Sequence, residues 1–101
     1  MDPERLSDIH ISDVVLSTAG RDKNELFYVI GEDPLYLTLA NGKDRPLDRP
    51  KLKKRKHVQK VLRSETRVAD KLRAGDKVLN SELRRDLAFH AGQMQVDNLG
   101  G

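Results

Sequence analysis

The chain has 101 residues, of which 37% are hydrophobic and 35% are charged. This length allows one small domain with a single core, and the composition is too apolar and too balanced in charge for wholesale disorder. The absence of cysteine excludes disulfides, cysteine-ligated metal centres and thiol nucleophiles. The longest apolar run, residues 26–30, is far shorter than the roughly 18 residues of a membrane helix. The first residues lack the features of a signal peptide, so we expect a cytoplasmic protein that does not bind membranes.

The net charge of +3 is unevenly distributed along the chain. Residues 1–42 hold three basic residues against eight acidic ones, whereas residues 43–63 hold ten basic residues against two acidic ones. Pro46 and Pro50 stiffen this basic block. Such a concentration of positive charge favours a polyanionic partner, and the alternative interpretations are an ordinary solvated loop and a nuclear import signal over residues 50–56.

Patterns typical of strands begin after a polar amino-terminal segment. Residues 13–16 and 26–30 are rich in β-branched and aromatic residues and flank a polar loop, which predicts a hairpin. Residues 35–40 alternate leucines with other side chains, which predicts a third strand.

The dipeptide Asn41-Gly42 favours a tight turn, so we expect a fourth strand over residues 43–47. Pro46 would restrict that strand to an edge or a bulge. A fifth strand is expected over residues 57–62. Five short strands predict a mainly β protein built on a small, partly open, SH3-like barrel. The core positions of this barrel should include Ile30, Leu37, Leu39 and Val58.

After the strands the apolar period becomes helical. Ser64 is a candidate N-cap for a short helix that ends at Gly75. Asn80 or Ser81 could begin a second short helix. The apolar faces of these two helices contain Val68, Ala69, Leu72, Leu79, Leu83 and Leu87. Helices of this length are marginal in water unless they dock on the barrel or on a partner.

The chain is therefore expected to divide into four parts. Residues 1–10 form a flexible arm, and residues 11–63 form the barrel with its basic connection. Residues 64–92 form a helical appendage, and residues 93–101 form a disordered tail.

No pattern of catalytic residues is present in the sequence. His10, His57 and His90 lack the spacing of a metal site, and the serines lack the glycine frame of a nucleophile elbow. The loop around Gly20 has one glycine and does not open a helix, unlike a phosphate-binding P-loop. We therefore expect no enzymatic activity, no cofactor, no metal and no small-molecule substrate.

Residues 13–30, the predicted hairpin, resemble the KOW motif, which implies two strands of an SH3-like barrel around a glycine-bearing loop. Residues 41–51 and 56–59 are similar to bacterial KOW-domain RNA-binding proteins related to the archaeal and eukaryotic large-subunit ribosomal protein of the L-fourteen type. The resemblance spans residues 11–63, and residues 71–87 look like the tail of the same bacterial group. It implies ribosomal RNA binding and a place in translation or transcription complexes.

The chain departs from the family pattern at two positions where that pattern has glycine. One is Asn24, and the other lies just before the first strand, at Ser12 or Asp13. Asparagine is the next best residue for a left-handed backbone, so the resemblance implies this conformation at Asn24.

The resemblance and the basic block together predict a non-catalytic RNA-binding protein of the translation apparatus, monomeric when free, that binds ribosomal RNA or another structured RNA. Phosphate contacts position a protein, and RNA shape supplies much of the specificity. The residues expected to contact RNA are Arg21, Lys23, Arg45, Arg49, Lys51, Lys53, Lys54, Arg55, Lys56 and His57. Tyr36 is either a stacking surface for a base or a cross-strand packing residue.

The alternative function is a protein-docking KOW module of the transcription machinery. Its contact surface would combine the acidic first block with the apolar helix faces, which contain Val68, Leu72, Leu83 and Leu87.

Overall fold

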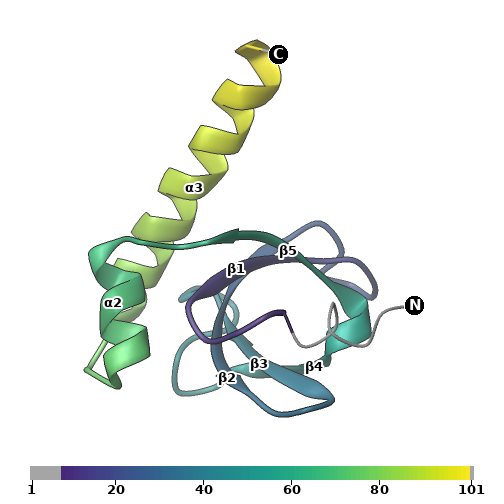
Figure 1. The fold of residues 1–101 in the computed structure, drawn as a ribbon, viewed down its shortest axis with the longest axis vertical. Coiled ribbons are helices and arrows are strands. Elements are labelled where there is room, and N and C mark those ends of the chain that lie inside the picture. The colour runs from purple at the N-terminus through teal and green to yellow at the C-terminus, as the bar shows by residue number, and fades with distance from the viewer. Residues whose placement is uncertain (1–7, 101) are drawn as a thin grey trace.

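The computed structural model describes residues 8–100, with side chains for residues 8–94. Five strands form one antiparallel sheet in the order β4-β3-β2-β1-β5. The strands are β1 (Asp13–Ser17), β2 (Leu26–Glu32), β3 (Tyr36–Ala40), β4 (Lys51–Lys54) and β5 (Val58–Arg63). A 3₁₀ turn, η1 (Arg55–His57), joins β4 to β5, and the helices α2 (Arg67–Ala74) and α3 (Asn80–Gly100) follow. The sheet curls into a small barrel with both helices on one side, which confirms the expected fold class (Figure 1).

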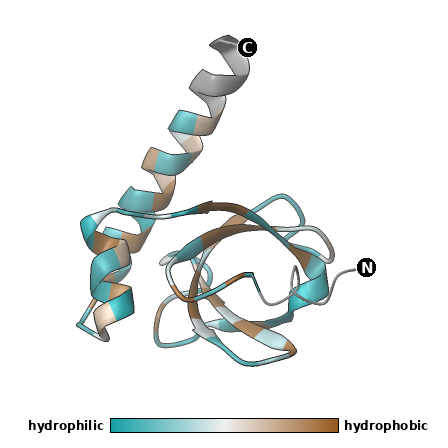
Figure 2. Cartoon of the chain, viewed as in Figure 1, coloured by the Kyte–Doolittle hydropathy of each residue, from teal (hydrophilic) through white to brown (hydrophobic). Residues whose placement is uncertain are grey.

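The apolar side chains form two clusters because neighbouring residues of a strand point to opposite faces. One cluster fills the barrel and contains Ile9, Val15, Phe27, Val29, Leu37 and Leu39. The other lies between the sheet and the helices and contains Val14, Tyr28, Ala40, Val68, Leu83 and Leu87. Brown, hydrophobic positions accordingly follow the strands, whereas much of the loop ribbon is teal (Figure 2). Both faces of β1 and β2 are therefore covered.

The predicted core positions are only partly correct. Leu37 and Leu39 are fully buried, as expected, but Ile30 and Val58 are half-buried at the margins of the two clusters. Ile9 is buried inside the barrel, so the arm expected over residues 1–10 is packed at its end. Residues 1–7 of that arm lie outside the described residues.

The fourth strand is not where the sequence predicted it. Residues 43–47 belong to a loop, and β4 begins at Lys51. The side-chain oxygen of Asn41 accepts hydrogen bonds from the backbone N–H groups of Lys43 and Arg45, which closes a compact turn in place of a hairpin. Proline also lacks the N–H group that a strand ladder needs, so pairing resumes only after Pro50.

The helices begin and end close to the expected positions, with two differences. Thr66, rather than Ser64, caps α2, since its hydroxyl accepts a hydrogen bond from the backbone N–H of Ala69. Gly75 ends α2 with a φ of 74°, as expected. Helix α3 continues to Gly100, although a disordered tail was expected from residue 93, and its carboxyl-terminal part projects away from the barrel (Figure 1). No helix within residues 8–100 is long and apolar enough to cross a membrane.

Candidate nucleic-acid interface

The basic run after Pro50 is divided by the alternation of strand β4. Lys51 and Lys53 lie opposite Leu39 and Leu37 of β3, on the face that turns into the barrel. Lys54 lies opposite Tyr36 and therefore shares the outer face of the sheet. The expected continuous strip of RNA contacts is thus wrong, because alternate cations of the run point inward.

The inward lysines bind one carboxylate on the β1–β2 loop. Lys53 Nζ lies 2.7 Å from Asp22 Oδ1 and 2.6 Å from the carbonyl oxygen of Ala19, and Lys51 Nζ lies 2.7 Å from Asp22 Oδ2. Ser17 donates a further hydrogen bond of 2.7 Å to the same carboxylate. Burial by itself would raise the pKa of Asp22, but the hydrogen bonds from Lys51, Lys53 and Ser17 outweigh it and hold this pKa far below its usual value. These contacts fix the β1–β2 loop against β4.

Arg55 is also an internal residue. Its guanidinium donates hydrogen bonds to the backbone oxygens of Ile9 and Asp33, at 2.8 and 2.9 Å, and it lies 3.4 Å from a carboxylate oxygen of Glu32. With 7% of its surface exposed, Arg55 joins the amino-terminal segment to the β2–β3 turn. Lys51, Lys53 and Arg55 therefore stabilise the fold, and we no longer expect them to contact RNA.

Four other predicted cations remain on the surface near this anchor. Arg21, Lys23, Lys54 and Lys56 are exposed, and none of these side chains has a hydrogen-bond or ion-pair partner in the part of the chain that the structure describes. The first two lie on the β1–β2 loop, and the other two lie on the β4–η1 segment. We call these four residues the basic end.

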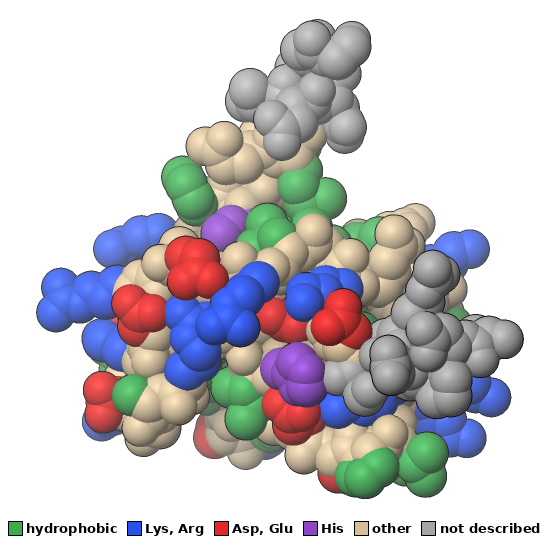
Figure 3. Space-filling view, in the orientation of Figure 1, with side chains coloured by type: hydrophobic (Ala, Val, Ile, Leu, Met, Phe, Trp, Pro, Cys, Tyr) green, Lys and Arg blue, Asp and Glu red, His purple; other side chains and the backbone are tan. Residues whose placement is uncertain are grey.

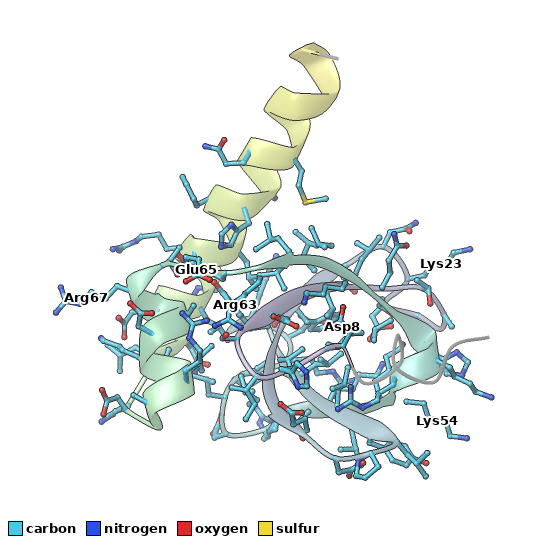
Figure 4. All side chains as sticks on the ribbon, in the orientation of Figure 1. Asp8, Lys23, Lys54, Arg63, Glu65 and Arg67 are labelled. Carbon is cyan, nitrogen blue, oxygen red and sulfur yellow. The ribbon has the colours of Figure 1, made fainter. Side chains whose placement is uncertain are left out.

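Several bonds hold the two segments of the basic end together. Besides the lysine contacts of Asp22, the backbone N–H of Thr18 donates to the carbonyl oxygen of His57 at 2.9 Å. Lys23 and Lys54 project from the side of the barrel away from the helices, whereas Arg67 projects from α2 on the other side (Figure 4). The basic end thus combines cations from two distant parts of the sequence on segments that are bonded to each other.

The remaining predicted contacts lie elsewhere or are less accessible. Arg45 and Arg49 are exposed on the β3–β4 loop. The start of α3 holds that loop, because Asn80 accepts a hydrogen bond from the backbone N–H of Leu47 and Arg84 donates to the carbonyl oxygen of Gly42. His57 is half-buried in η1.

One face of the molecule carries a mixture of positive and negative side chains. On the face drawn in Figure 3, acidic and basic side chains alternate over the middle of the molecule, and Lys and Arg side chains project at both sides. Lys60 forms an ion pair with Asp13, at 3.3 Å, and His10 Nδ1 lies 3.0 Å from a carboxylate oxygen of Glu32. Paired charges of this kind leave little field to attract a polyanion.

A shallow pocket adjoins the basic end on the outer face of β3 and β4. It has a volume of about 310 Å³ and is lined by Pro34, Leu35, Tyr36, Lys54, Arg55 and Lys56. Leu35 is 70% exposed, so an apolar wall faces solvent directly. The β2–β3 turn that carries this wall is fixed by Asp33, whose carboxylate accepts hydrogen bonds from the backbone N–H groups of Leu35 and Tyr36. Those two bonds lower the pKa of Asp33.

A buried polar network, which no pattern in the sequence indicated, lies between the barrel and α3. The Tyr28 hydroxyl bonds to the carboxylate of Asp86 and to Ser64 Oγ, the latter at 2.9 Å, and lies 3.3 Å from His90 Nε2. Burial and the Asp86 carboxylate raise the pKa of Tyr28 to about 12. The same ring nitrogen of His90 faces Tyr28, Ser64 and Asp86, so these residues lack the relay through both ring nitrogens that a serine-type triad uses. The network attaches α3 to the sheet.

The described residues contain no group of three or more histidine, cysteine or acidic side chains that could hold a metal.

The apolar helix faces are occupied by the protein itself, because Val68, Leu83 and Leu87 are buried against the chain's own barrel. These three residues are therefore not exposed as the alternative function expected, Leu72 is half-buried against the same cluster, and the contribution of the acidic first block stays a prediction. No protein-family model matches the chain, and no curated protein matches it significantly in sequence.

Proposed function

We propose that this protein is a non-catalytic RNA-binding component of the translation apparatus, acting in the cytoplasm as a monomer when free. One observation supports this proposal above the others: four exposed cations that have no partner among the described side chains are carried by two segments that the ion pairs of Asp22 hold together. Such a preorganised surface loses little conformational entropy when it binds a phosphate backbone. Arg21, Lys23, Lys54 and Lys56 would make the phosphate contacts.

The backbone also agrees with the KOW resemblance at Asn24 and at Ser12, which is one of the two candidates, Ser12 or Asp13, for the glycine before the first strand. Asn24 has a φ of 74° and Ser12 a φ of 79°. These are the left-handed conformations in which glycine is most readily accommodated. The agreement supports assigning the RNA-binding function of KOW-domain proteins to this chain.

The salt dependence of RNA binding tests the proposal. Each phosphate contact contributes about 0.7 to 0.9 to the slope of log binding constant against log salt concentration, because it releases condensed counterions. The double variant Lys54→Ala, Lys56→Ala should therefore make the slope for a structured ribosomal RNA fragment shallower by roughly 1.4 to 1.8. Folding should be unchanged, because both side chains are exposed.

The matched control removes two exposed cations from the helical part of the chain, one on α2 and one between α2 and α3. The variant Arg67→Ala, Lys77→Ala changes the net charge by the same amount but should leave the slope close to that of the wild type. Equal losses in the two variants would show that RNA responds only to net charge. An absence of saturable RNA binding by the wild-type protein at physiological salt would favour the protein-docking alternative instead.

Sedimentation through a sucrose gradient tests the place in translation. The protein should travel with ribosomal particles at low salt and be released as salt increases. The Lys54→Ala, Lys56→Ala variant should be released at a lower salt concentration than the Arg67→Ala, Lys77→Ala control. Sedimentation only at the top of the gradient would remove the ribosomal assignment.

A further inference from the structure

The pocket beside the basic end combines three features in one place. Its lining includes an aromatic residue, Tyr36, and an apolar part formed by Pro34 and Leu35. Its rim carries Lys54 and Lys56, which are exposed and have no partner in the described part of the chain. Tyr36 and Lys54 are paired across β3 and β4, so the ring and the ammonium group lie on the same face of the sheet.

We infer that this pocket binds one unpaired nucleobase of a single-stranded RNA segment, with the base against Tyr36 and the adjoining phosphates on Lys54 and Lys56. The inference rests on the proposed function and specifies how the RNA is held. Every base has a flat π-face that can stack on an aromatic ring without regard to sequence. A nucleotide also carries an anionic phosphate next to its apolar face, which matches the arrangement of ring and lysines.

Hydrogen bonds hold the pocket in shape from both sides without a ligand. The Asp33 carboxylate holds the turn that carries Pro34 and Leu35, with hydrogen bonds of 2.9 and 2.7 Å to the backbone N–H groups of Leu35 and Tyr36. From the other side, the backbone N–H of Arg55 donates to the carbonyl oxygen of Leu35 at 2.9 Å. A preformed site of this kind favours a flat ligand over one that must reshape its walls.

The lysines of the rim distinguish this ligand from the apolar side chain of a protein partner. An apolar side chain would fill the pocket but would leave the two ammonium groups without a counterion. A nucleotide uses both parts of the site. The pocket should consequently prefer single-stranded RNA to a duplex, in which the bases are paired and stacked on each other.

Binding of a short oligoadenylate, compared with a blunt RNA duplex of equal length, tests this inference. Tyr36→Leu removes the ring and keeps an apolar strand residue, and it should weaken oligoadenylate binding by roughly 5- to 100-fold, the range expected for one stacked base. Tyr36→Phe should bind like the wild type, because it keeps the ring. Phe89→Leu, which removes a ring that is 53% exposed on α3, is the matched control and should also bind like the wild type.

Tyrosine fluorescence gives a direct reading of the stacked ring. The chain has no tryptophan and two tyrosines, and Tyr28 is fully buried. Oligoadenylate should therefore quench the emission of Tyr36 in the wild type, whereas Tyr36→Phe should bind equally well without that quenching. Melting curves of all the variants should coincide, so a loss of binding is separated from a loss of folding.

The outcomes separate this inference from the proposed function. If Tyr36→Leu binds oligoadenylate as the wild type does while Lys54→Ala, Lys56→Ala loses affinity, RNA binding stands and the nucleobase site is wrong, which would favour a protein side chain as the occupant of the pocket. If the duplex binds as tightly as the single strand and quenches equally, the nucleobase site is also wrong. If the wild-type protein binds neither RNA, the proposed function itself fails.

Discussion

The Lys53 ammonium and the Asp22 carboxylate form an ion pair of 2.7 Å in which both side chains are less than one-tenth exposed. Lys53 is thereby committed to the β1–β2 loop and is not available to a ligand. The pair joins the edge strand β4 to a loop 31 residues earlier in the chain. It holds the loop that carries Arg21 and Lys23 against the strand that carries Lys54, so a buried charge pair fixes the segments that bear the exposed charges.

Removing one partner of this pair should be costly. Asp22→Ala leaves Lys53 buried without a counterion, which should lower the free energy of unfolding by about 3 to 5 kcal/mol. Adding Lys53→Met to that variant should recover part of the loss, because a buried charge is replaced by an apolar side chain. Urea unfolding of the single and double variants measures both effects. Glu65→Ala, which removes a largely exposed partner of Arg63, is the control and should cost less than about 1 kcal/mol.

The same carboxylate should make stability dependent on acidity. Because the pKa of Asp22 in the folded protein lies below its ordinary value of 3.8, the ionised group stabilises the fold at neutral pH. That contribution should decrease as the pH falls below 3.8 and continue to decrease toward the lower pKa of the folded state. The difference in unfolding free energy between the wild type and Asp22→Asn should shrink over this range. A difference that stays constant from pH 7 to about pH 2 would contradict the assignment.

Tyr28→Phe tests the network that attaches α3 to the barrel. The substitution keeps the buried ring but removes the hydroxyl that bonds to Ser64 and Asp86, which should cost about 1 to 3 kcal/mol in thermal or urea unfolding. The raised pKa of Tyr28 means that its protonated form stabilises the folded protein below pH 10, and that this stabilisation is lost as the pH rises toward about 12. Alkaline unfolding of the wild type should show this loss, and Tyr28→Phe should not.

Asn24 allows a test of the backbone. Because its φ is 74°, Asn24→Gly should stabilise the protein or leave it unchanged, whereas Asn24→Ala should destabilise it by about 1 kcal/mol or more. The comparison is clean because the side chain is exposed. Ser12 has a similar φ of 79°, but its hydroxyl accepts a hydrogen bond of 2.6 Å from Arg73, so Ser12→Gly exchanges that bond for relief of backbone strain. Matching stabilities for the glycine and alanine variants of Asn24 would contradict the left-handed geometry.

The sequence predicted the elements whose signals are local. Strand β3 follows from the alternation of Leu35, Leu37 and Leu39, and the end of α2 follows from Gly75. The predicted strand over residues 43–47 failed because the side chain of Asn41 closes a turn, an interaction that competes with the hairpin that Asn41-Gly42 favours.

The candidate site was harder to predict, because the alternation of a strand, and not the composition of the basic run, decides which cations are buried and which are exposed. The signal in the sequence was the period of two in Lys51, Lys53 and Arg55, which would have indicated a strand with one basic face turned inward. Because the basic segment was expected to be a loop between two strands, this alternation was not used to predict which cations are buried. The Tyr28 network gave no such signal, because His90 lies 62 residues from Tyr28 and only the docking of α3 brings them together.

Strand β4 is hydrogen-bonded to β3 alone among the described strands, so one side of its backbone is unpaired. An unpaired strand edge is a template on which another chain can add a strand and begin to aggregate. Here the edge is only four residues long, Lys51 and Lys53 point inward to Asp22, and Lys54 is exposed, so the strand is short and carries charged side chains that oppose edge-to-edge pairing. The residues that hold the β1–β2 loop in place, together with the exposed lysine that we propose to contact RNA, thus also oppose self-association of the barrel through this edge.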